Sequence, residues 1–148
     1  MKTLPVLALV AAFGMSFVPQ EPAGKPTAPV APAARQEAFM AALKAGDVAK
    51  AYEGLTKGSR LEGKDEQLAN LREQTEKAVK IYGGVVAWEN AGIARQEKHQ
   101  ALGIAILCCD HVPVYFYFIW YRNAETAPWT LVNVWFSDQA KDYFILRR

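Results

Sequence analysis

The segment from Val112 to Phe136, VPVYFYFIWYRNAETAPWTLVNVWF, constrains the fold more than any other part of the chain. Its β-branched and aromatic residues are typical of strands, and the polar stretch NAETAP has the length of a hairpin loop. A strand at a protein surface normally alternates apolar and polar residues, because successive side chains point to opposite faces of the sheet. Here both faces are apolar or aromatic. The sequence therefore predicts a hairpin that is covered on both of its faces.

The first 34 residues differ in composition from the rest of the chain. Residues 1–18 combine Lys2 with an apolar run from Leu4 to Val18, which is the pattern of a secretory signal peptide. The alternative is an uncleaved N-terminal membrane anchor, although the run is shorter than the ~20 residues that a membrane span needs. Residues 19–34 are rich in proline and alanine and predict an extended linker. We therefore expect an exported protein, periplasmic or secreted, with one folded domain in residues 35–148.

Charge and motif content exclude several classes of function. The net charge of +2 predicts no basic surface of the kind that binds nucleic acid or an anionic membrane. The two histidines, His99 and His111, lack the spacing of a metal site, and no motif for a phosphate or another cofactor occurs. Cys108 and Cys109 are neighbours in an expected strand and point to opposite faces, so a disulfide between them would distort it. We interpret one as a small buried residue and the other as a plain thiol on the opposite face, with a redox or intermolecular thiol as the alternative.

Two helices are expected before the sheet. Apolar residues recur with helical spacing between residues 35 and 55, and Gly46 and Asp47 interrupt them. Because glycine ends helices and aspartate caps them, we expect this first helix to be kinked or split there. The second helix is expected to begin near Ser59 and Glu62, which have the spacing of a capping box, and to end before Gly83.

After Gly84 the apolar period changes from that of a helix to that of a strand. Four strand-like segments follow one another with short breaks, in residues 85–98, 99–111, 112–122 and 128–137. Helices followed by consecutive strands indicate an α+β fold, with the helices packed on one face of a four-stranded antiparallel sheet.

This order of elements resembles the nuclear transport factor 2-like superfamily, the cone-shaped α+β fold that also includes ketosteroid isomerases. The likeness lies in ALKAGDVAKAYEGL, YGGVVAWENAG and FYFIWYRNAETAPWTLVNVWFSD, and it extends over roughly residues 35–142. It implies a curved sheet and a cone-like shape. The chain is most similar to small exported members without an assigned activity, and a fold alone does not give chemistry.

The resemblance implies two ways to cover the second face of the hairpin: a second copy packed sheet to sheet, or a small apolar ligand inside the cone. We expect Trp120 to pair with Thr130, so that Thr130 faces the helices and Leu131 faces away from them. The face away from the helices then carries amphipathic rings, which suit a surface that is apolar on one side and wet on the other. A homodimer through this face is the expectation, and cover by the C-terminal segment YFILRR is the alternative. The candidate partner surface comprises Tyr115, Tyr117, Tyr121, Trp129, Asn133 and Trp135.

Candidate catalytic residues are few. An enzyme of the ketosteroid isomerase type needs a carboxylate base and buried donors. Glu89 or Asp110 fits the role of the base, and Tyr115 or Tyr117 fits that of the donor. Asp110 and His111 are adjacent in an expected turn, which favours a solvated pair over a catalytic dyad. The sequence therefore favours an exported, non-catalytic binding or protein-interaction domain that needs no cofactor. The alternative is a small-molecule isomerase or dehydratase that uses the cone pocket.

Overall fold

The computed structural model describes residues 31–146. The expected signal peptide, in residues 1–18, and residues 19–30 of the expected linker lie outside this range. Helix α1, Pro32–Lys44, begins three residues before the expected domain boundary, with its proline in the first helical turn. A proline is well suited to that position, because its missing N–H would have no partner in the first turn. Within residues 31–146 no helix is long and apolar enough to cross a membrane.

The expected break in the first helix is confirmed, and it separates two helices. Gly46 adopts a φ of 80° after α1, and Asp47 caps α2, Val48–Thr56. The Asp47 carboxylate accepts a hydrogen bond of 2.9 Å from the backbone N–H of Lys50. A left-handed glycine followed by an aspartate cap is a common way to end one helix and start the next.

Helix α3, Asp65–Ile81, begins later than the capping-box pattern predicts. Ser59 and Glu62 do accept backbone hydrogen bonds, but their donors are Leu61 and Gly58. These bonds stabilise the turn between α2 and α3 instead of capping α3. The assignment of Ser59 and Glu62 to the start of this helix was therefore wrong.

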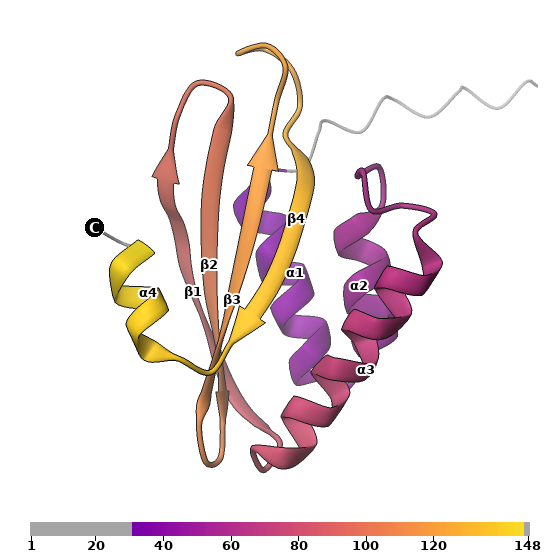
Figure 1. Cartoon of the computed structure of the whole chain (residues 1–148), viewed down its shortest axis with the longest axis vertical. Helices are drawn as coiled ribbons and strands as arrows, with labels where there is room; N and C mark the ends of the chain where they lie inside the picture. The colour runs from indigo at the N-terminus through magenta and orange to yellow at the C-terminus, as the bar shows by residue number, and fades with distance from the viewer. Residues whose placement is uncertain (1–30, 147–148) are drawn as a thin grey trace, which may run out of the picture.

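The four expected strands form one antiparallel sheet in the order β1-β2-β3-β4. Their bounds are β1 Val85–Gln96, β2 Gln100–Cys109, β3 Pro113–Tyr121 and β4 Thr130–Ser137. The α+β class and the four-stranded antiparallel sheet are thus confirmed. A further helix, α4, Ala140–Leu146, follows β4 and was not expected from the sequence. Figure 1 shows α1, α2 and α3 on one side of the sheet and α4 on the other.

The main core fills the space between the sheet and the first three helices. Phe39 of α1 lies at its centre, with ring centroids 5.1 Å from Tyr52, 5.3 Å from Phe116 and 5.6 Å from Phe118. The hydroxyl groups of Tyr52 and Thr75 are 2.8 Å apart and share a hydrogen bond that joins α2 to α3. Close packing of aromatic rings leaves this side of the sheet dry.

A bulge in β4 corrects the expected register of the last hairpin. Trp120 pairs with Leu131, and Ile119 pairs with Asn133, so that Val132 is an extra residue in β4. Leu131 therefore faces the helices and is fully buried, whereas it was expected on the opposite face. Thr130 pairs with Tyr121, on the face away from the helices. Side chains alternate along a strand, so an extra residue makes the residues beyond the bulge point to the opposite face of the sheet.

Candidate functional site

The face of the sheet that points away from α1, α2 and α3 is the candidate site, and we call it the α4 face. Strand pairing assigns its residues, because side chains directly opposite one another across strands share a face. Residues in the middle of this face are mostly aliphatic or aromatic, and residues towards the edges of the sheet are polar. Members of the α4 face on β2, β3 and β4 include Leu102, Ile104, Ile106, Tyr115, Tyr117, Ile119, Tyr121, Asn133 and Trp135.

Helix α4 covers one half of this face. Tyr143 of α4 stacks on Tyr115, with centroids 5.2 Å apart and planes at 28°. Tyr117 stacks on Trp135 at 5.1 Å and is completely buried. Tyr115 and Tyr117, which were expected on an open partner surface, therefore belong to a second small core beneath α4. The alternative expectation, cover by the C-terminal segment, describes this half of the face correctly.

Three hydrogen bonds hold the start of α4 at the end of the sheet. Ser137 Oγ donates to Asp142 Oδ2 at 3.1 Å and accepts from the backbone N–H of Gln139 at 3.0 Å. Tyr82, at the end of α3, donates to Asp138 Oδ2 at 2.8 Å. These bonds are partly or fully exposed to solvent, so each contributes modestly to stability. Stacking of Tyr143 is the main apolar contact of α4 with the sheet.

The other half of the α4 face is open. A hollow of about 280 Å³ lies there over Leu102 and Ile119, and it is edged by Arg95, Glu97 and Gln100. Arg95 and Glu97 form an exposed ion pair of 3.3 Å on its rim. Tyr121 is 46 % exposed, and Asn133 is exposed beside it. An apolar floor with a polar edge is the usual composition of a binding surface.

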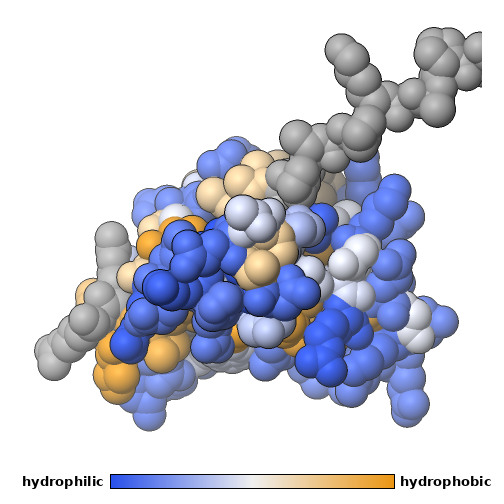
Figure 2. All heavy atoms as spheres, turned by 90° about the horizontal axis from the view of Figure 1, so that it is seen from above, coloured by the Kyte–Doolittle hydropathy of each residue, from blue (hydrophilic) through white to orange (hydrophobic). Residues whose placement is uncertain are grey.

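Helix α4 also presents apolar side chains to solvent. Phe144 and Ile145 are 60 % and 67 % exposed, and Leu146 is 36 % exposed. Figure 2 shows hydrophobic residues at the edge of the molecule where α4 lies in Figure 1. A seven-residue helix that buries Tyr143 on one side therefore offers an apolar surface on its other side.

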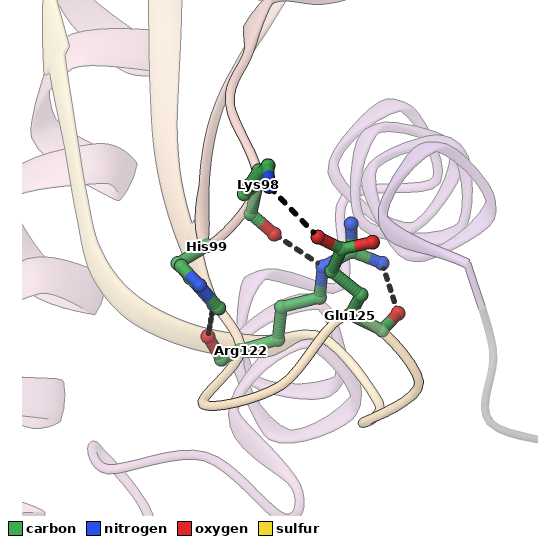
Figure 3. Close-up of polar contacts among 4 residues, drawn as sticks. All are labelled: Lys98, His99, Arg122 and Glu125. Carbon is green, nitrogen blue, oxygen red and sulfur yellow. Dashed lines mark hydrogen bonds and ion pairs between the residues drawn. The ribbon is translucent and has the colours of Figure 1, made fainter.

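Trp129, a further residue of the expected partner surface, lies elsewhere. Its ring packs against the main core, and the Arg122 guanidinium carbon lies 4.4 Å above the ring centroid. Arg122 also joins the loop between β1 and β2 to the loop between β3 and β4 (Figure 3). Its Nε donates to the Lys98 carbonyl at 2.7 Å, and its Nη1 donates to the Glu125 carbonyl at 2.6 Å. Lys98 and Glu125 form an ion pair of 3.4 Å across the same loops. Arg122 is a structural residue that the sequence pattern did not identify.

The candidate catalytic residues are not brought together. Glu89 is exposed on β1, and Asp110 is exposed in the turn between β2 and β3, where its carboxylate lies 3.4 Å from His111. The Tyr117 hydroxyl is buried and has no hydrogen-bond partner within residues 31–146. Burial raises the pKa of Tyr117 to about 12, and the charge of Asp142 adds to the shift. A general base has to reach the proton that it removes, and this arrangement provides no such contact.

Cys108 and Cys109 lie on opposite faces of β2, as expected for neighbours in a strand. Both are partly buried and neither forms a disulfide within the described chain. Burial raises the pKa of each thiol, with a further contribution from Glu89 for Cys108. A raised pKa reduces the thiolate fraction and hence the reactivity of a cysteine. Among residues 31–146, no group of three or more His, Cys, Asp or Glu side chains is arranged to hold a metal ion.

Comparisons with protein-family models, with curated proteins and with solved structures find no match for this chain.

Proposed function

We propose that the domain is a non-catalytic binding module of the nuclear transport factor 2-like kind, with a cone-like shape, and that its α4 face associates with a second copy. The observation that carries the proposal is the exposure of Phe144 and Ile145 on α4, at 60 % and 67 %. Burial of one such side chain in an interface contributes roughly 1.5–3 kcal/mol. Contiguous exposed apolar surface of this kind usually marks a contact with a partner.

A second copy is the partner that suits this surface best. A two-fold contact places the same patch on both chains, so an apolar centre meets an apolar centre and the polar edges meet at the rim. The open half of the α4 face supplies that rim through Arg95, Glu97 and Asn133. The hollow over Leu102 and Ile119 could receive Phe144 or Ile145 of the other chain. In this proposal Tyr121 belongs to the interface, and Tyr115 and Tyr117 support α4 from beneath.

Light scattering of the full chain across a concentration series tests this proposal. We expect the mass to rise from that of one chain to that of two. Ile145→Asp should raise the dissociation constant at least about tenfold, because it would bury a charge in the contact. The matched control is Ile81→Asp, since Ile81 is 70 % exposed but lies on α3. A strict monomer at all concentrations, or an equal effect of the two variants, would contradict self-association through the α4 face.

Export is the second part of the proposal, and residues 1–34 support it by their composition. Fusion of these residues to an alkaline phosphatase reporter, which is active only outside the cytoplasm, should give an active enzyme. Cleavage near residue 18 would distinguish a signal peptide from an N-terminal anchor. A reporter that stays inactive would count against export in either form.

A further inference from the structure

A surface groove between α1 and α2 is separate from the α4 face. It has a volume of about 350 Å³, and its floor is formed by Phe39 and Leu55, each of which is 1 % exposed. Small residues on facing sides of the two helices leave the space above this floor open. They are Ala34, Ala38 and Ala42 on α1, and Ala51 and Gly54 on α2. A β-carbon added to Gly54 would meet no atom within 4 Å.

Three cationic side chains lie at the edge of this apolar groove. Arg35, Lys50 and Lys57 line it, and no acidic residue does. Within residues 31–146 none of the three forms an ion pair. Because only residues 45–47 connect α1 to α2, the helices run antiparallel, and Arg35 near the start of α1 lies towards the same end as Lys57, which follows α2.

Arg35, which lines the groove, has an unsatisfied donor. Its Nη1 atom is buried and has no hydrogen-bond partner in the described part of the chain. A buried donor of a charged group without a partner is costly, and an anionic oxygen is the acceptor that satisfies a guanidinium best. The groove therefore combines an apolar trough with an unsatisfied cationic end.

We propose that this groove binds a medium-chain carboxylate, with the alkyl chain over Phe39 and Leu55 and the carboxylate at Arg35 and Lys57. A neutral apolar molecule would leave the three cations unpaired, and a cationic one would be repelled by them. The groove volume lies in the range of small-molecule sites, which is roughly 300–1,000 Å³. This site is independent of self-association through the α4 face.

Calorimetric titration of the full chain with sodium decanoate, below the concentration at which it forms micelles, tests the proposal. Decanoate should bind at one site, and decanol, which has the same chain without the charge, should bind about tenfold or more weakly. Decyltrimethylammonium should not bind. The absence of decanoate binding, or equal binding of decanoate and decanol, would overturn the proposal.

Two variants assign the binding to this groove. Gly54→Leu should abolish binding by filling the trough, and it should melt no lower than the parent protein, because leucine favours a helix and the space is empty. Arg35→Gln should weaken decanoate binding at least about tenfold and leave decanol binding unchanged. Lys80→Gln, at an exposed position on α3, is the matched charge control and should change neither. Full affinity of both Gly54→Leu and Arg35→Gln for decanoate would show that the ligand binds elsewhere, for example at the apolar residues 4–18, and would overturn the proposal.

Discussion

The side-chain amide of Gln36 on α1 lies directly against Gly103 on β2, so that a β-carbon at position 103 would overlap it. Gln36 is fully buried, and neither its amide nitrogen nor its oxygen has a hydrogen-bond partner within residues 31–146. The absence of a side chain at Gly103 allows α1 to approach β2 at this point. The Gln36 amide therefore packs closely against Gly103 and leaves its hydrogen-bonding groups unsatisfied within residues 31–146.

Gln36→Met should stabilise the protein. The substitution keeps the length of the side chain and removes a buried amide without partners, which costs about 1–3 kcal/mol. We expect the free energy of unfolding to rise by about 1 kcal/mol, measured by urea denaturation. A loss of stability would indicate that the amide has a partner, such as a buried water molecule.

Gly103→Ala should destabilise the protein by about 1–3 kcal/mol, because overpacking forces the Gln36 side chain or α1 to move. In a Gln36→Ala background the space is vacated, and the penalty of Gly103→Ala should largely disappear. A double-mutant cycle of denaturation measurements gives this coupling energy. Gly54→Ala is the control for a glycine in open space, and it should instead stabilise α2 by about 0.5–1 kcal/mol. Additive effects of the two substitutions at 36 and 103 would contradict the contact.

Substitutions of Tyr117 distinguish a core residue from an interface residue. Tyr117→Phe should change stability by less than about 1 kcal/mol, since the buried hydroxyl has no partner in the described chain. Tyr117→Glu should cost about 3–5 kcal/mol or prevent folding, because it buries an unpaired charge. Tyr121→Glu, at a position that is 46 % exposed, should cost the monomer less than about 0.5 kcal/mol. A folded Tyr117→Glu variant with weaker self-association would show that Tyr117 belongs to the partner surface.

Stability should fall as the pH rises above about 10. Burial raises the pKa of both Tyr52 and Tyr117 to about 12, whereas an unfolded tyrosine has a pKa of about 10. Their stabilising contribution is therefore fully present below pH 10 and is lost as the pH rises towards 12. In that interval the unfolded chain has released protons that the folded chain still binds, so the free energy of unfolding falls by up to about 1.4 kcal/mol per pH unit for each tyrosine.

Urea denaturation at about pH 9, 10 and 11 measures this dependence. Tyr117→Phe should make the decline between pH 10 and 11 shallower than in the parent protein, because one of the groups with a raised pKa is removed. Identical slopes for Tyr117→Phe and the parent protein would show that Tyr117 titrates at an ordinary pKa.

Local sequence signals were sufficient to predict most of the elements. Gly46 and Asp47 separate two helices because backbone freedom and side-chain capping act within a few residues. The alternation of residues after Gly84 correctly predicted four consecutive strands, and with them the α+β class. The expected signal peptide and the resemblance to the nuclear transport factor 2-like superfamily remain predictions.

The candidate site depended on contacts that local signals do not encode. Helix α4 has only seven residues, too few to be stable alone in water, and it is held by the packing of Tyr143 on Tyr115. The bulge at Val132 that turns Leu131 towards the helices follows from packing between β3 and β4. Whether Tyr117 is a surface or a core residue was thus decided by a helix that forms only on the folded sheet.

Periodicity and turn chemistry are local properties, and they were enough to predict the class of the fold, the number of strands and the need to cover both faces of the last hairpin. Tertiary structure alone decided that α4 covers one half of the second face, that Leu102 and Ile119 lie beneath an open hollow, and that Gln36 meets Gly103. The physical reason is that strand register and helix docking depend on shape complementarity between segments far apart in the chain, which a local pattern of apolar and polar residues does not specify.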